Sequence, residues 1–321
     1  MDIYEMFHRL DAARSRIDLS AIPLPGARRD FLAKSEDGAP VFLLSDSSPP
    51  DYFPPIELQN VRVDFHQPCS VDTCGSQSEG QFATVSCDAR VPELHEIFIH
   101  SVAASLQKLP VSANTLDLQA CIQSLLRLFQ ALSKPSGRHV AGLWGELFVI
   151  KSVRRKDLLL NAWHSKINER FDFSWSNGCL EVKATTTGWR RHEFSQQQLC
   201  PSVIGRGWVV SLMLQRQNGG LGVVDLAREI EADIYRFPEL REKLWECVLS
   251  SVGSEFSESL DVRFDVGYAE RNMMIIPMSE VPRIPDPQDP RISGVKYQAD
   301  LSSSIASRGD LARSEIDHMF S

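Results

Sequence analysis

The stretch FDFSWSNGCLEVKATT, residues 171–186, decides the fold because it predicts a β-hairpin with one polar face and one apolar face. The Asn-Gly dipeptide at positions 177 and 178 favours a two-residue type I′ turn between the two strands. Such a turn fixes which residues lie opposite each other. The expected pairs are Ser176 with Cys179, Ser174 with Glu181, and Asp172 with Lys183.

Paired residues of a hairpin lie on the same face of the sheet, so this register assigns each side chain to a face. The polar face carries Asp172, Ser174, Glu181 and Lys183. The apolar face carries Phe171, Phe173, Trp175, Leu180, Val182 and Ala184. In this register Asp172 and Glu181 are diagonal neighbours, about 7–8 Å apart at the backbone. A slip of one residue would place the two acids on opposite faces.

The polar face has the groups that phosphodiester hydrolysis requires. Two carboxylates and a backbone carbonyl, here that of Val182, suit a hard cation such as Mg²⁺, with Mn²⁺ as a substitute. Lys183 lies beside them and can hold or polarise an attacking water. Taken alone, Glu181 and Lys183 are more often a surface ion pair, because residues two apart share a face of any strand.

A helix is predicted over residues 139–153, HVAGLWGELFVIKSV, and it supplies a third acid. Between Val140 and Ile150 it is apolar nearly all round, which indicates a buried helix, and its single charge there is Glu146. A buried carboxylate needs a partner, a metal ion or a raised pKa. Glu146 therefore either completes the metal site or is a structural acid bonded to a loop.

The rest of the chain predicts an α/β (α+β) protein, a mixed β-sheet flanked by helices. Residues 1–93 are expected to form a β-rich N-terminal region, 94–235 a helical lead-in and the core, and 236–321 a C-terminal elaboration with a polar tail. Residues 71–80 are expected to form a polar, mobile loop, and 262–278 a strand pair. Further strands are predicted at 40–45, 61–65 and 207–215, and helices at 93–109, 115–134, 223–237 and 238–252.

Charge and composition limit the class of protein. The net charge is −8, yet residues 138–216 carry +6, so the remainder carries −14. A basic centre in an acidic chain fits a local phosphate site, although a solvated face would look the same. The seven cysteines are irregularly spaced, and the chain shows no leader peptide and no run of about 18 apolar residues. We therefore expect a reduced, cytoplasmic protein with no membrane partner.

The order of these motifs resembles that of the PD-(D/E)xK nucleases, the restriction-endonuclease-like superfamily, and within it the bacterial DUF4420 family. The resemblance covers most of the chain from about Leu94 onward. It is carried by GLWGEL (142–147), Trp163 ahead of FDF (171–173), LEVKAT (180–185), the series His192, Ser195, Gln198 and Leu199, and then VPRI (281–284) and VKYQADL (295–301).

The resemblance implies a restriction-endonuclease-like three-layer core and Mg²⁺-dependent cleavage of DNA in bacterial restriction or phage defence. By position, Asp172 and Glu181 would be the metal ligands, Lys183 the catalytic lysine and Glu146 the helix acid. Gln198 would lie near the site, with Ser195 as the expected helix cap before it. Phe171 stands where the nominal motif has proline, which weakens the match only slightly.

Two functions follow from the sequence. The first is a metal-dependent DNA endonuclease, for which Arg190, Arg191 and His192 are candidate phosphate contacts just after the catalytic strand. The second is a catalytically weak module of the same fold that binds DNA or partner proteins in a defence complex. The negative net charge suits a protein that relies on other subunits, or on a homodimer, for its DNA affinity.

Overall fold

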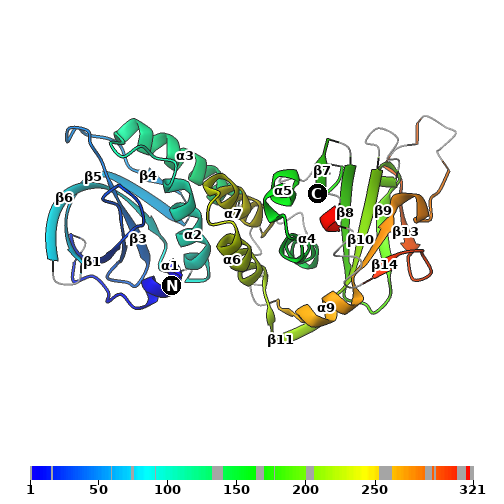
Figure 1. Cartoon of the computed structure of the whole chain (residues 1–321). Helices are drawn as coiled ribbons and strands as arrows, with labels where there is room; N and C mark the ends of the chain where they lie inside the picture. Colours follow the sequence, from blue (N-terminus) through cyan, green and yellow to red (C-terminus); the bar gives the residue numbers. More distant parts are fainter. Residues whose placement is uncertain are drawn as a thin grey trace. The chain divides into compact units, whose positions relative to one another are not determined.

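The computed structural model divides the chain into two compact units, each described by itself (Figure 1). The described residues up to 131 form the first unit, and those of 140–252 and 262–318 form the second. The structure describes residues 2–15, 17–58, 60–73, 76–90, 92–131, 140–163, 170–176, 178–199, 206–252, 262–285, 291–292, 294–308 and 316–318.

The first unit is a six-stranded sheet in the order β1-β2-β3-β6-β5-β4 with helices beside it. Strand β1 pairs with both β2 and β5, so the sheet closes on itself. The strands are β1 (Asp18–Pro23), β2 (Phe31–Lys34), β3 (Pro40–Ser45), β4 (Ile56–Glu57), β5 (Val61–Thr73) and β6 (Ser76–Cys87). The helices are α1 (Ile3–His8), η1 (Pro92–Leu94), α2 (His95–Leu106) and α3 (Thr115–Ala131).

The β-rich character predicted for residues 1–93 is confirmed, but the loop predicted at 71–80 is wrong. Strands β5 and β6 pair through this segment as a long hairpin, with Asp72 opposite Gln77 and Ser70 opposite Glu79. The segment reads as polar because only every second residue of β5, such as Val71, is buried. Helices α2 and α3, which the sequence predicts as the helical lead-in of residues 94–235, lie in this unit.

The second unit is built on a five-stranded mixed sheet in the order β14-β12-β10-β8-β7. Strands β8 and β10 are parallel, and the other neighbours are antiparallel. The strands are β7 (Phe173–Trp175), β8 (Gly178–Thr185), β9 (Arg191–Ser195), β10 (Arg206–Met213), β11 (Arg216–Leu221), β12 (Met274–Pro277), β13 (Lys296–Asp300) and β14 (Ser307–Arg308). The helices are α4 (Val140–Ser152), α5 (Lys156–Ala162), η2 (Gln196–Leu199), α6 (Val223–Asp233), α7 (Pro238–Val252), α9 (Val266–Asn272) and η5 (Met278–Glu280).

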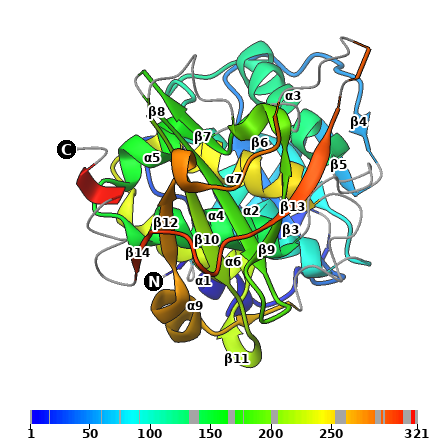
Figure 2. The ribbon, with the colours of Figure 1, turned by 90° about the vertical axis from the view of Figure 1, so that its right-hand side faces the viewer.

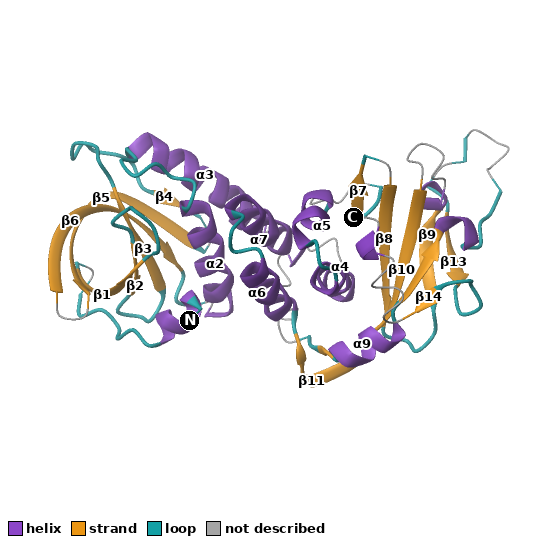
Figure 3. Ribbon diagram, viewed as in Figure 1, coloured by secondary structure: helices purple, strands orange, loops and turns teal. Residues whose placement is uncertain are grey.

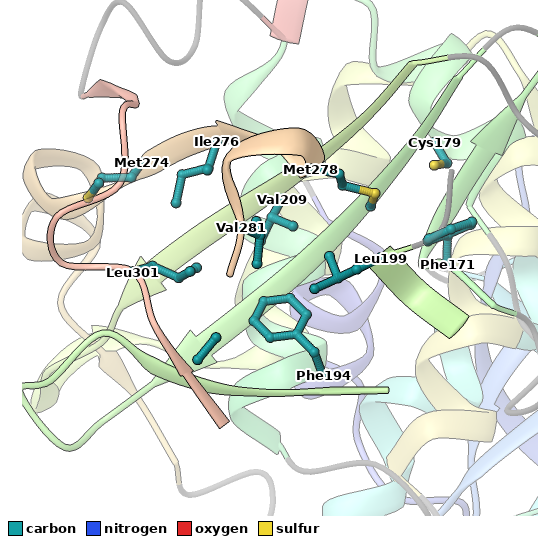
Figure 4. Close-up of a cluster of buried hydrophobic side chains, with 11 residues drawn as sticks. Phe171, Cys179, Phe194, Leu199, Val209, Met274, Ile276, Met278, Val281 and Leu301 are labelled. Atoms are coloured by element: carbon teal, nitrogen blue, oxygen red, sulfur yellow. The ribbon is translucent and has the colours of Figure 1, made fainter. Parts of the chain in front are cut away.

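This unit has three layers, with α4 on one face of the mixed sheet and the two-stranded β9–β13 sheet on the other (Figures 1 and 2). Gly145 brings α4 close to the sheet, since a Cβ there would lie 3.3 Å from atoms of both Val182 and Ala184. The opposite face of the mixed sheet is covered by a cluster of buried apolar side chains (Figure 4). Its buried members are Phe171, Cys179, Phe194, Leu199, Val209, Met274, Ile276, Met278, Val281, Ala299 and Leu301.

The hairpin register differs from the prediction by two residues. Trp175 lies opposite Gly178, and Ser174 lies opposite Cys179. Gly178 is therefore part of β8 and not of the turn. The reason is local packing: the Trp175 indole covers Gly178, where a Cβ would lie only 2.5 Å from the ring. Because a shift of two preserves the alternation of side chains, the predicted faces are unchanged for the paired residues of β7 and β8. The face predicted for Phe171 is wrong: this residue precedes β7 and packs with Cys179 in the cluster on the face opposite α4.

The segment predicted as a strand pair at 262–278 is instead helix α9 followed by strand β12 (Figure 3). The Asp265 side chain caps the helix by accepting a hydrogen bond of 2.9 Å from the backbone N–H of Tyr268. Within the part of the chain that the structure describes, no helix is long and apolar enough to cross a membrane. The cysteines described there are not joined in disulfide bonds, namely Cys69, Cys87, Cys121, Cys179 and Cys247. Cys74 and Cys200 lie outside the described residues.

Candidate active site

Asp172 is held against strand β8 by a backbone hydrogen bond. Its Oδ2 accepts from the N–H of Val182 at 2.8 Å, just before β7 begins at Phe173. The carboxylate therefore lies beside the backbone between Glu181 and Lys183. Beyond the effect of burial, the Asp172 carboxylate is close enough to Glu181 to raise its pKa.

Glu181 is a buried carboxylate, 3% exposed, whose two oxygens have different surroundings. Oε1 accepts hydrogen bonds from Lys183 Nζ at 2.8 Å and from Gln198 Nε2 at 2.6 Å. Oε2 is buried and has no hydrogen-bond partner. Burial, together with the nearby Asp172 carboxylate, raises the pKa of Glu181 to about 8, although Lys183 opposes the shift.

Gln198 is oriented by the short helix η2 that follows β9. Its Oε1 accepts from the Ser195 backbone N–H at 3.0 Å, so its amide N–H group faces Glu181. The Ser195 hydroxyl in turn accepts from the Gln198 N–H at 3.3 Å, which matches the predicted cap. Lys183 Nζ lies 3.5 Å from Gln198 Oε1 and 5.3 Å from the centroid of the Phe194 ring. Gln198 thus contacts both members of the Glu181–Lys183 pair.

Glu146 lies on the opposite side of β8 from Glu181 and Lys183. It lies on α4, which packs on the Val182 face of β8, while Glu181 and Lys183 lie on the other face. Its Oε2 accepts from the indole N–H of Trp163 at 2.7 Å. Among the described residues no group of three His, Cys, Asp or Glu side chains is placed to hold a metal ion, so Glu146 is not gathered with the other two acids.

Trp163 gives Glu146 a positioning role that the sequence did not reveal. The Trp163 ring stacks on Phe173 with centroids 6.4 Å apart, and the two residues also form a backbone bridge. Glu146 thereby orients the residue that supports β7, immediately after Asp172. A tryptophan ahead of the FDF motif was part of the family resemblance, but its contact with Glu146 has no local sequence signal.

Glu146→Gln is expected to retain the melting temperature and the cation affinity of the wild type, since the glutamine oxygen can still accept from Trp163. Glu146→Ala leaves a buried indole donor and a cavity, and we expect a loss of ~2–4 kcal/mol in the free energy of unfolding. Thermal denaturation with and without Mg²⁺ measures both quantities. A large loss of cation-induced stabilisation in Glu146→Gln would instead make Glu146 a metal ligand.

Two of the three candidate phosphate contacts are buried. The Arg190 guanidinium donates to Ser211 O and Oγ, each at 3.0 Å, and burial lowers its pKa to about 10. His192 Nε2 lies 2.8 Å from Ser211 Oγ, and burial, with Lys183 nearby, lowers its pKa to about 4. These residues tie β9 to β10, so neither is presented to a substrate. Arg191 alone is on the surface.

Comparison with known proteins identifies a family. Residues 4–302 match the model of the DUF4420 family, which is described as "Putative PD-(D/E)XK family member". No curated protein and no solved structure matches the chain.

Proposed function

The chain belongs to the DUF4420 family of PD-(D/E)XK proteins, and from this premise we propose that it is a Mg²⁺-dependent DNA endonuclease. The observation that carries the proposal is the buried Glu181 Oε2, which lacks a hydrogen-bond partner and lies beside a second carboxylate. An unpaired buried carboxylate oxygen is costly in a purely structural role. A divalent cation would satisfy this oxygen and offset the repulsion between the two acids.

The residues present fit a hard divalent cation. Asp172 and Glu181 offer carboxylate oxygens, and the Val182 carbonyl is a third candidate ligand of the same kind. Glu181 Oε1 is already occupied by two donors, so Oε2 is the oxygen that remains for a cation. When bound, Mg²⁺ would supply Lewis-acid polarisation of the scissile phosphate and charge stabilisation. Mn²⁺ has the same ligand preference and is expected to substitute.

Side chains of the protein are expected to position the water and to hold the metal ligands in place. Lys183 lies 2.8 Å from Glu181, where its ammonium group can hold the attacking water and offset charge on the phosphate. Gln198 keeps Glu181 and Lys183 in this geometry through its amide. Asp172 stays fixed through its bond to Val182 N–H. Attack of water on phosphorus breaks the P–O ester bond and leaves one phosphate and one hydroxyl end.

We further propose that DNA is cleaved in restriction or phage defence, and that other subunits or a homodimer supply part of the affinity. The net charge of −8 supports such dependence, because non-specific DNA affinity comes largely from neutralised phosphates. Of the three arginine and histidine candidates, only Arg191 is presented to solvent.

Incubation of the purified protein with supercoiled plasmid and Mg²⁺ is expected to yield nicked and linear DNA. Omitting the cation or adding EDTA should abolish the products, and Mn²⁺ should restore them. Several salt concentrations are needed, because DNA affinity falls steeply with ionic strength. If no product forms with either cation while the protein still binds DNA, the chain is instead a binding module of the nuclease fold.

A further inference from the structure

An exposed tryptophan follows the catalytic strand. Residues 186–189, here called the Trp189 loop, lie in the connection between β8 and β9, and Trp189 is 64% exposed. Burial of a tryptophan is normally favourable, and single exposed apolar residues need no special explanation. The Trp189 loop therefore requires further observations before a role can be assigned to it.

The first observation is that hydrogen bonds within the loop hold its backbone while the Trp189 indole stays exposed. Thr187 N–H donates to Thr185 Oγ1 at 3.3 Å, and the two threonine hydroxyls lie 3.0 Å apart. Gly188 has a φ of +76°, a conformation that favours glycine, and it turns the chain just before Trp189. The exposed indole is thus carried on a structured turn and not on a core contact.

The second observation is the cation beside the ring. The Arg191 guanidinium carbon lies 5.7 Å from the Trp189 ring centroid, a cation–π distance. Its acidic partner Asp300 is 3.3 Å away, but the two side chains are 62% and 44% exposed, so the ion pair is weak. An exposed aromatic face beside an arginine is the chemistry that stacks on nucleobases and contacts the adjoining phosphate.

The third observation is continuity with the candidate active site. Glu181, Lys183 and Thr185 follow one another on one face of β8, and the Trp189 loop continues that strand. Trp189 comes six positions after Lys183, which is at most ~20 Å of extended chain. This reach corresponds to about six phosphates along one strand, at ~3.4 Å per step.

We propose that Trp189 stacks on an unpaired base of the substrate, with Arg191 on an adjacent phosphate. This proposal rests on the proposed function and narrows it to nucleic acids that are unpaired or locally opened near the cleaved bond. A paired base inside a duplex does not offer its face to a side chain, so fully paired DNA would not use this contact.

The test is binding without turnover, measured by fluorescence anisotropy in EDTA. The probes are a labelled 20-nucleotide oligothymidylate and a blunt duplex of the same length. Trp189→Ala is expected to weaken binding to the single strand about tenfold while changing duplex affinity little. Trp189→Phe should keep most of the affinity, and Arg191→Ala should weaken binding and reduce its salt dependence.

Tyr235 provides a matched control. It is also exposed and has an arginine, Arg236, stacked 5.2 Å from its ring centroid, but it lies between α6 and α7. Tyr235→Ala should bind both probes as the wild type does. The proposal is overturned if Trp189→Ala binds the single strand normally, if both probes are weakened equally, or if the wild type binds neither.

Binding and cleavage remain distinguishable in this design. A wild-type protein that binds the single strand through Trp189 but never cleaves plasmid contradicts the nuclease function and leaves the contact standing. A wild-type protein that cleaves plasmid while Trp189→Ala binds and cleaves normally contradicts the contact alone.

Discussion

Replacement of Lys183 by alanine is expected to reduce the rate of Mg²⁺-dependent plasmid cleavage by about 10³-fold. The ammonium group is the one cation within 3 Å of Glu181 among the ion pairs of the described residues, and its loss removes both water positioning and charge compensation. Loss of a single preorganised donor in other hydrolytic sites costs about 10²–10³ in rate. Initial rates of nicking at saturating Mg²⁺ give the comparison.

Lys296 supplies the control for this substitution. It is an exposed lysine on β13 whose side chain pairs with the exposed Glu193 at 3.0 Å. Lys296→Ala should cleave at the wild-type rate. Both variants need a thermal denaturation curve, because Gln198 still binds Glu181 after the loss of Lys183 and the fold should persist. Equal cleavage by Lys183→Ala and the wild type would exclude the proposed catalytic role.

Glu181→Gln is expected to have opposite effects on activity and on the stability of the metal-free protein. The amide removes the repulsion from Asp172 and the cost of the buried charge, while Oε1 can still accept from Lys183 and Gln198. At pH 8 without metal, the free energy of unfolding of the variant should exceed that of the wild type by on the order of 2–4 kcal/mol. Its cleavage rate should fall to background because a cation ligand is lost.

The raised pKa of Glu181 also predicts how its contribution to stability changes with pH. The folded protein raises the pKa of Glu181 from 4.5 to about 8, so between these values the folded state holds a proton that the unfolded state has released. The wild-type stability contributed by this group is therefore present below about pH 4.5 and declines as pH rises to 8. The difference between wild type and Glu181→Gln isolates this contribution from the other titrating groups.

Added Mg²⁺ should remove most of this difference in stability. A cation that binds only the folded wild type at a hundred times its dissociation constant adds ~2.7 kcal/mol, and the Gln variant should gain little. Chemical denaturation at pH 5 and pH 8, with and without Mg²⁺, measures all four values. If the difference in unfolding free energy between the metal-free wild type and Glu181→Gln is the same at pH 5 and at pH 8, the burial and repulsion assigned to Glu181 are contradicted.

The candidate site was largely predictable because a strand alternates its side chains with a period of two. The predicted register was off by two residues, since the Trp175 ring covers Gly178, yet the paired residues of β7 and β8 keep their predicted faces, and only Phe171, before β7, does not. Asp172 lies next to Glu181 and Lys183 through its bond to Val182 N–H, and their joint role as a site stays a prediction. Gln198 also contacts Glu181, as its predicted location suggests, because its helix follows β9 directly and Ser195 caps that helix.

Helix α9 shows where local patterns failed. The stretch around VRFDVGYAERN contains β-branched and aromatic residues that favour strand, but the Asp265 cap and the pairing of β12 with β10 decide otherwise. The β5–β6 hairpin was missed for the opposite reason. Its polar residues looked like loop, and burial of alternate residues emerges only when the sheet closes on itself.

The sequence by itself determined the mixed α/β class, the buried helix α4 and the two faces of the β7–β8 hairpin, because these depend on periodicities within short segments. The tertiary structure decided the surroundings of Arg190, His192 and Glu146. Strand β13 pairs with β9 from about a hundred residues away, and Arg190 and His192 are buried against Ser211 of β10. Glu146 meets Trp163 through the packing of α4 and α5. Such contacts join distant segments, so no local pattern of residues encodes them.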